Sequence, residues 1–145
     1  MKIIVNEQTD IQEEEIIIRC QQYSDYIQEL VDYINHYQNR LICKKDNSNY
    51  SILVSEIYYI ESVDNKTFVY TKDDCFEVNY PLYELENRLK DNQCLRISKS
   101  CILNIHYLKS VKALFNGKYE ALLINHEKII ISRKYVSHFK KAFGL

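Results

Sequence analysis

The chain has 145 residues, 46% of them hydrophobic, which fits one domain with at most a short attachment and allows a core without disulfides or metal. No apolar run approaches the roughly 20 residues of a membrane span, and acidic residues follow the first apolar run too closely for a signal peptide. We therefore expect a cytoplasmic protein. The five cysteines are irregularly spaced without a CxxC pair, so we expect reduced core side chains rather than a zinc site or a redox motif.

The net charge of −1 hides an asymmetry along the chain. Residues 1–93 contain 9 Lys or Arg and 18 Asp or Glu, whereas residues 94–145 contain 10 and 2. A basic C-terminal third on an acidic body is typical of a protein that binds a polyanion. The same asymmetry also fits a domain whose two faces neutralise each other, and charge alone does not separate the two interpretations.

The first 39 residues predict a strand–strand–helix unit. Residues 1–8 and 15–21 have strand propensity and are separated by an acidic turn. In the following stretch, apolar side chains recur at helical spacing, with Ser24 placed to cap the helix. These side chains are Tyr23, Tyr26, Ile27, Leu30, Val31, Ile34 and Tyr37. The unit is too small to be stable alone, so we expect it to dock on the rest of the chain or on a partner.

From residue 40 the pattern changes to short strands joined by tight turns. Two helices are expected, one over 81–89 opened by Pro81 and one over 133–144 capped by Ser132 and ended by Gly144. The strands are expected at 40–46, 50–53, 56–62, 67–72, 75–78, 94–98, 99–104, 108–115, 118–124 and 127–132. Strands and helices do not alternate regularly, so residues 40–145 should form a mainly β, antiparallel domain, α+β overall with its short helices.

Three turns carry basic or small polar residues suited to a phosphate backbone. Arg133 and Lys134 lie in the first turn of the last helix, where the helix dipole already favours an anion. Lys99 follows Ser98 at a strand end, and small hydroxyl residues there allow a duplex to approach. Lys66 and Thr67 are expected in a loop between two strands.

Residues 40–145 resemble the LytTR DNA-binding domain, the output module of many bacterial response regulators. The resemblance rests on the order of four stretches: EIYYIES (56–62), PLYELENRL (81–89), LRISKSCILNIHYLKSV (95–111) and IIISRKYVSHFKK (129–141). It implies an elongated, mostly β domain that reads DNA with loops inserted into grooves, bends the duplex, and binds direct repeats as two copies. By position, the resemblance gives DNA contacts to Lys66, Thr67, Ser98, Lys99, Arg133 and Lys134.

The chain departs from the family pattern at four places. Ser98 and Lys99 stand where the family usually has His and Arg, Cys94 replaces a common Phe, and Asn125–His126 replaces an Asn-Gly turn. A lysine cannot make the planar, bidentate contact to guanine that arginine makes, so base preference at the second loop is open.

The resemblance implies a cytoplasmic bacterial transcription regulator, and only about 40 residues precede it, where relatives carry a receiver domain. We expect residues 1–39 to mediate homodimerisation or contact with a separate sensor, such as a membrane protein; they could equally extend the core. The alternative function is a protein-interaction adaptor that has lost DNA binding. We expect no enzyme and no cofactor, because the four histidines are scattered and no Gly-rich phosphate loop occurs. RNA binding is disfavoured, since the aromatic residues do not line one strand face.

Overall fold

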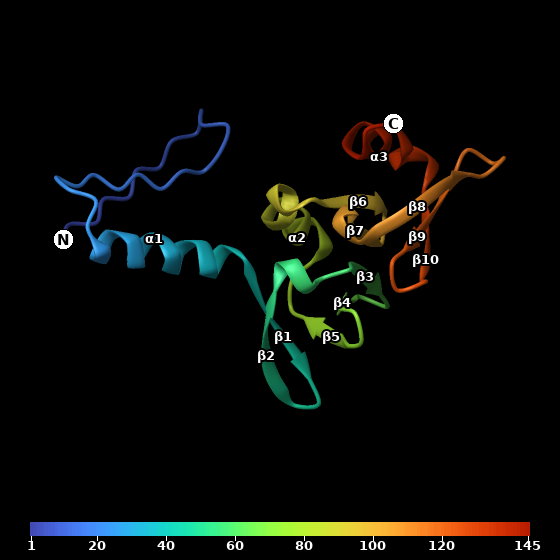
Figure 1. Ribbon diagram of the computed structural model, residues 1–145, viewed down its shortest axis with the longest axis horizontal. Helices are drawn as coiled ribbons and strands as arrows, with labels where there is room; N and C mark the ends of the chain where they lie inside the picture. The colour runs from blue at the N-terminus through green and yellow to red at the C-terminus, as the bar shows by residue number, and fades with distance from the viewer.

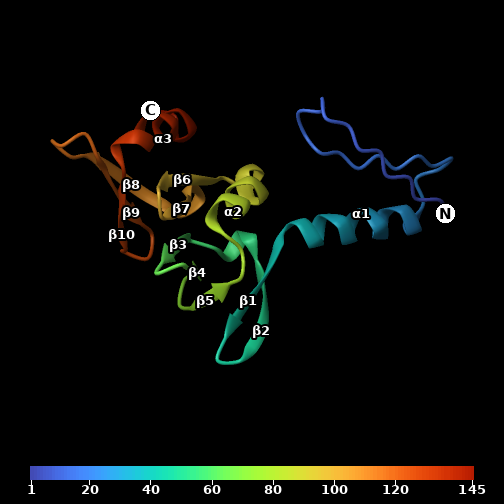
Figure 2. The same cartoon turned by 180° about the vertical axis from the view of Figure 1, so that it is seen from behind.

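The computed structural model describes residues 1–145, the side chain of His36 excepted, as an elongated molecule (Figure 1). An N-terminal coil and a long helix form one end, and a β body with two short helices forms the rest (Figures 1 and 2). The helices are α1 (Asp25–Gln38), α2 (Leu82–Leu89) and α3 (Arg133–Phe143). The strands are β1 (Arg40–Lys45), β2 (Ser48–Leu53), β3 (Tyr59–Val63), β4 (Lys66–Tyr70), β5 (Cys75–Val78), β6 (Cys94–Ser98), β7 (Cys101–Asn104), β8 (Leu108–Ala113), β9 (Tyr119–Leu123) and β10 (Lys128–Ile131).

The strands form two antiparallel sheets. The larger has the order β2-β1-β5-β4-β3-β7-β6, and the smaller has the order β10-β9-β8. Each strand pairs in an antiparallel register, and neighbours in sequence are mostly neighbours in space, as hairpin connections require. The prediction of a mainly antiparallel β domain is confirmed.

Two of the hairpin turns are tighter than the sequence pattern indicated. Asp46 and Asn47 reverse the chain between β1 and β2, with φ of 51° and 63°, and Asp64 and Asn65 do so between β3 and β4, with φ of 52° and 62°. Successive left-handed residues define the type I′ turn that matches the twist of paired strands, and Asp and Asn tolerate this conformation. Strand β4 therefore already begins at Lys66.

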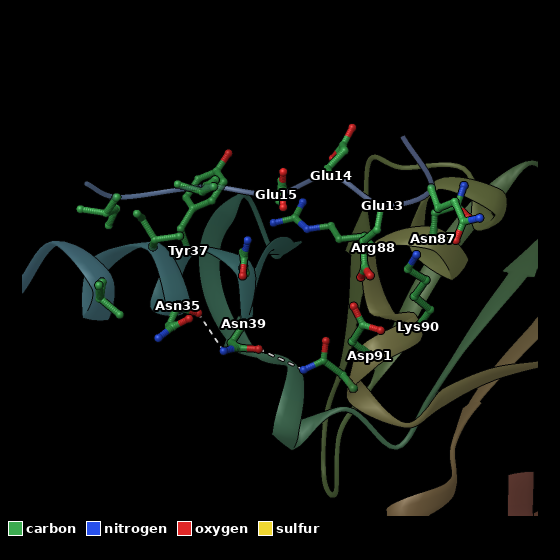
Figure 3. A pocket seen from close by; sticks show the side chains of 17 residues that line it. Glu13, Glu14, Glu15, Asn35, Tyr37, Asn39, Asn87, Arg88, Lys90 and Asp91 are labelled. Atoms are coloured by element: carbon green, nitrogen blue, oxygen red, sulfur yellow. Dashed lines mark hydrogen bonds between the residues drawn. The ribbon is translucent and has the colours of Figure 1, made fainter. Parts of the chain in front are cut away.

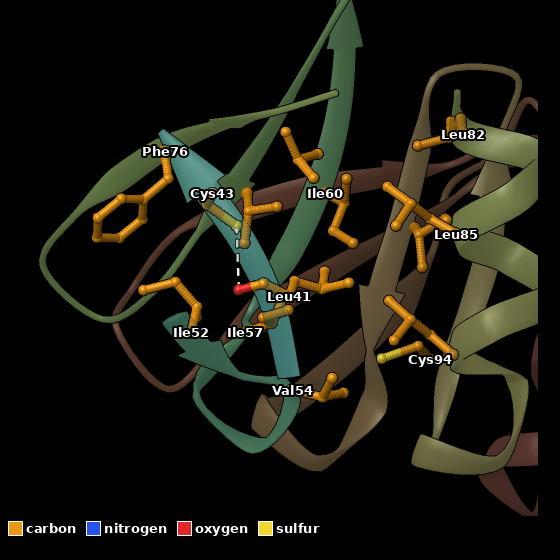
Figure 4. Packing of buried hydrophobic residues seen from close by; sticks show 14 residues of the cluster. Leu41, Cys43, Ile52, Val54, Ile57, Ile60, Phe76, Leu82, Leu85 and Cys94 are labelled. Atoms are coloured by element: carbon orange, nitrogen blue, oxygen red, sulfur yellow. Dashed lines mark hydrogen bonds between the residues drawn. The ribbon is translucent and has the colours of Figure 1, made fainter. Parts of the chain in front are cut away.

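The first hydrophobic core lies between the larger sheet and α2 (Figure 4). Its helix side is formed by Leu82, Leu85 and Leu89, which are buried as the helical spacing predicted. Pro81 occupies the N-cap position, so its missing N–H costs no hydrogen bond. Cys43 and Cys94 also lie in this core.

The second core lies between the larger sheet, the smaller sheet and α3. Its largest member is the fully buried Phe139 of α3. Strand β7 is buried at all four positions, because Ile102 faces the first core while Cys101 and Leu103 face the second. Asn104 ends this strand and is buried with its polar atoms satisfied: its side-chain amide donates to the Ile57 carbonyl (2.9 Å) and its carbonyl oxygen accepts from the His106 N–H (3.0 Å).

The cysteine prediction is right for three residues and wrong for two. Cys43, Cys94 and Cys101 are buried, whereas Cys20 and Cys75 are exposed, and all five are free thiols. Burial raises the pKa of Cys43 to about 11 and that of both Cys94 and Cys101 to about 12. The three buried thiols are therefore neutral core side chains at physiological pH.

The N-terminal unit differs from its prediction. The helix is confirmed as α1, where the Ser24 hydroxyl accepts from the Ile27 N–H at 3.4 Å. The strands expected at 1–8 and 15–21 are wrong, because the structure describes these residues and assigns them no strand. Strand propensity expresses packing against neighbouring strands, and here no strand pairs with either segment.

Residues 12–18 run near α1 and α2 but leave a space between themselves and the two helices. An open cavity of about 880 Å³ separates them (Figure 3). Its floor is bridged by Asn39, which donates to the Asn35 carbonyl (2.8 Å) and accepts from Asn92 (3.0 Å). Within residues 1–39, every residue whose burial is described is exposed or half-buried, so neither core includes them.

None of the helices in the described part of the chain is both long enough and apolar enough to cross a membrane.

Candidate nucleic-acid interface

The β6–β7 turn presents Lys99 to solvent. Lys99 and Ser100 are exposed, while Ser98 is half-buried. The Ser98 hydroxyl accepts from the Ser100 N–H at 3.1 Å and lies 3.4 Å from the Ser100 hydroxyl. The small hydroxyl residues therefore stabilise the turn itself, and Lys99 at its apex is the residue free to meet a ligand.

Arg96 holds this turn from behind. Its Nε donates to the Ser98 carbonyl at 2.7 Å and its Nη2 to the Lys99 carbonyl at 2.5 Å. Its Nη1 forms an ion pair with Glu86 of α2 at 2.9 Å, and the Arg96 side chain is only 16% exposed. The pairing of β6 with β7 shifts register between Arg96 and Ser98, a bulge that redirects the backbone here. One planar guanidinium thus connects the turn to α2.

The β3–β4 turn lies beside the β6–β7 turn. The Ser62 N–H, at the end of β3, donates to the Ser100 carbonyl at 2.8 Å. Lys66 is exposed, but it is the first residue of β4 rather than part of a loop. Thr67 lies in β4, as the strand expected at 67–72 predicted, and is only 7% exposed, so its placement in a contacting loop is wrong. The exposed residues here are Val63, Asp64, Asn65 and Lys66.

The start of α3 is fixed to the same region. The Ser132 N–H donates to the Ile97 carbonyl of β6 at 2.9 Å. Ser132 occupies the predicted N-cap position, but its hydroxyl makes no cap hydrogen bond; its carbonyl accepts from the Tyr135 N–H at 2.8 Å instead. Arg133 and Lys134 are exposed in the first turn, where the helix dipole adds to their positive charge.

The tip of the β8–β9 hairpin contacts Arg133. Gly117 has φ of 82°, and a Cβ placed on it would lie 3.2 Å from Cγ and 3.3 Å from Cδ of Arg133. Glycine is needed both for the left-handed backbone and for this close approach. The Arg133 stem therefore packs against the hairpin.

Backbone hydrogen bonds thus bring together all three predicted segments, although they are 30 or more positions apart in sequence. We call their exposed residues, 63–66, 99–100 and 133–134, the three-segment surface. Sequence reasoning missed the role of Arg96 in supporting it. The only signal is an arginine three positions before Lys99, and the sequence does not place its ion-pair partner, Glu86, nearby.

In the described part of the chain, no three His, Cys, Asp or Glu side chains gather as a metal site.

Comparison with known proteins identifies the family of this fold. The family model described as "LytTr DNA-binding domain" matches residues 47–144. The chain belongs to the LytTR family. Among solved structures, the LytTr DNA-binding domain of a putative methyl-accepting/DNA response regulator from Bacillus cereus superposes with a TM-score of 0.70 at 24% identity, covering 74% of this chain and 98% of that one. This likeness shows the LytTR fold.

Curated relatives share the domain at similar identity. The sensory transduction protein LytT of Bacillus subtilis is 28% identical over 104 residues, covering 72% of this chain and 43% of the relative. The transcriptional regulatory protein LytR of Staphylococcus aureus is 27% identical over 114 residues, covering 79% and 46%. The chain therefore spans less than half the length of these relatives. Family membership supports DNA binding by this domain.

Proposed function

We propose that this chain is a bacterial transcription regulator that binds double-stranded DNA sequence-specifically through the three-segment surface. The observation that carries the proposal is the pair of backbone hydrogen bonds, Ser62 to Ser100 and Ser132 to Ile97, which hold the three segments side by side. A surface built this way has a fixed shape and four cations, which are spread over three rigid segments: Lys66, Lys99, Arg133 and Lys134.

The proposed contacts follow from exposure. Lys66, Lys99, Arg133 and Lys134 are exposed and suited to phosphates or base edges. Arg133 can make a bidentate contact with guanine, whereas Lys99 acts as a point charge. Ser98 contributes by stabilising the turn, because its half-buried hydroxyl accepts from the Ser100 N–H, and Thr67 is too buried to contact DNA.

The test is a fluorescence-anisotropy titration of the wild-type chain on the DNA upstream of its own gene. The affinity should exceed that for a scrambled duplex and fall with a log–log salt slope of about −0.9 per phosphate neutralised. Folded protein that binds no duplex at low salt would contradict DNA binding and would favour the adaptor function.

We also propose that the N-terminal unit joins two copies into a homodimer that occupies direct repeats in the cytoplasm. Many of the exposed large apolar side chains lie within residues 1–37. On α1, Tyr26, Tyr33 and Tyr37 are 60%, 70% and 70% exposed, and their spacing places them on one helix face. A second copy of α1 would cover this face. The alternative partner for this apolar face is a separate sensor, such as a membrane protein.

Light scattering tests the homodimer. The wild-type chain should have the mass of two copies, and Tyr33→Glu should shift it to one, because a carboxylate would be buried in the seam. The matched control is Tyr83→Glu on α2, where the tyrosine is 63% exposed. A wild-type chain that stays monomeric over the concentration range would contradict the homodimer and leave the sensor as the partner to seek.

A further inference from the structure

Phe115, at the tip of the β8–β9 hairpin, has a fully exposed aromatic ring. Its relative exposure is 106%, above that of every other exposed large apolar side chain in the described residues, where the next value is 83%. Single apolar residues are common on protein surfaces, so exposure alone carries little weight. The surroundings of this ring give it meaning.

The hairpin tip is held in a fixed conformation. The Leu114 N–H donates to the Lys118 carbonyl at 2.8 Å, and the Gly117 N–H donates back to the Leu114 carbonyl at 3.2 Å. The Lys118 N–H also donates to the Asn116 side chain at 3.2 Å. The ring thus projects from an ordered turn, which lowers the entropy lost when it enters a binding site.

The tip lies beside the three-segment surface and in basic surroundings. Gly117, two residues after Phe115, packs against the stem of Arg133. Lys118 flanks the tip, and no Asp or Glu occurs between residues 92 and 119. Lys112, on the other side of the tip, forms an ion pair with Glu120 of β9 at 3.5 Å, so Lys118 and Arg133 are the cations left to attract a ligand here. The hairpin also forms the end of the molecule opposite the N-terminal coil (Figures 1 and 2). A ligand that binds Arg133 and extends past this end of the domain would pass the hairpin tip that carries Phe115.

We propose that Phe115 is an apolar wedge that stacks on, and partly opens, a DNA base step next to the groove contacted by Arg133; this inference rests on the proposed DNA binding. Duplex DNA satisfies both features of the site, because its phosphates attract the flanking cations while its base steps accept an aromatic ring. The wedge adds a contact that does not depend on charge. It also favours base steps that unstack easily, such as pyrimidine–purine steps.

The experiment uses the full chain and a duplex selected from a random pool by the wild-type protein. 2-Aminopurine is placed at successive positions of this duplex to report local unstacking. Phe115→Ala is compared with wild type and with Tyr83→Ala, a matched loss of an exposed aromatic ring on α2. Because the Phe115 ring contacts solvent only, the substitution should not affect folding, which thermal unfolding verifies.

Phe115→Ala is expected to weaken binding about tenfold without changing the salt slope, since a lost ring contact releases no counterions. Wild type and Tyr83→Ala should raise 2-aminopurine fluorescence at one step, and Phe115→Ala should not. The wedge is overturned if wild type binds but raises 2-aminopurine fluorescence at no position. It is also overturned if Phe115→Ala binds as tightly as wild type and raises the fluorescence equally. Either result leaves DNA binding itself intact. A random pool from which wild type selects no duplex overturns the proposed function itself.

Discussion

Replacing Lys99, Arg133 and Lys134 together by alanine is expected to weaken duplex binding by about 500-fold at about 0.1 M salt. If each cation neutralises one phosphate, the log–log salt slope should become shallower by about 2.7. At about 1 M salt counterion release contributes little, so the variant and the wild type should bind with similar affinity there. As salt is lowered, the difference between their log affinities should grow by about 2.7 for each tenfold dilution of salt. The three side chains are exposed, so the fold should be retained.

The measurement is fluorescence anisotropy of a labelled duplex at several salt concentrations. The matched control replaces Lys44, Lys72 and Lys90, which are exposed outside the three-segment surface, and it changes the net charge by the same amount. A control variant that loses as much affinity and slope as the first would mean that overall charge, rather than the three-segment surface, governs binding. Circular dichroism shows whether both variants are folded.

The elements best predicted from sequence are those whose pattern is local. Helix α2 was defined by Pro81 and by leucines at helical spacing, and the structure buries Leu82, Leu85 and Leu89 as expected. Gly144 ends α3 with φ of 90°, as a C-terminal glycine should. Here local propensity and tertiary packing favour the same structure, so the sequence is sufficient.

The failures occur where a distant partner decides the outcome. Residues 1–8 and 15–21 have strand propensity but find no strand to pair with, so they remain coil. The sequence favours a loop that includes Lys66 and ends at Thr67, but Asp64 and Asn65 suffice to reverse the chain, so Lys66 already belongs to β4 and Thr67 is buried. A two-residue type I′ turn cannot be distinguished from a longer loop without knowing the register of the strands.

The candidate site was predicted as three separate turns, and the sequence could not show that they adjoin. Their proximity depends on strand order: β3 pairs with β7, β7 pairs with β6, and Ile97 of β6 accepts the hydrogen bond from Ser132. Such contacts join residues that are 30 or more positions apart. The resemblance to LytTR domains supplied this grouping, and the hydrogen bonds give it a physical cause.

Arg96→Ala is expected to weaken DNA binding although Arg96 itself is largely buried. The guanidinium satisfies the carbonyls of Ser98 and Lys99 and pairs with Glu86, so removing it leaves polar groups without their partner. Hydrogen bonds to charged groups contribute about 1.5–3 kcal/mol each, and we expect unfolding free energy to fall by about 2 kcal/mol. The loosened turn should then present Lys99 less often in its binding geometry, which we expect to lower affinity by about tenfold.

A double-mutant cycle separates positioning from direct contact with DNA. If Arg96 acts by holding the turn, Arg96→Ala should cost much less affinity in a Lys99→Ala background than in wild type, because the residue it positions is already gone. Additive losses would contradict this role and would indicate that Arg96 contacts the duplex independently. Arg96→Lys should not rescue binding, since an ammonium cannot reach two carbonyls and a carboxylate as the planar guanidinium does. Glu86→Gln keeps an acceptor for Arg96 and should therefore change DNA affinity little. The coupling energy between Arg96 and Lys99 then measures the part of DNA binding that depends on the shape of the turn.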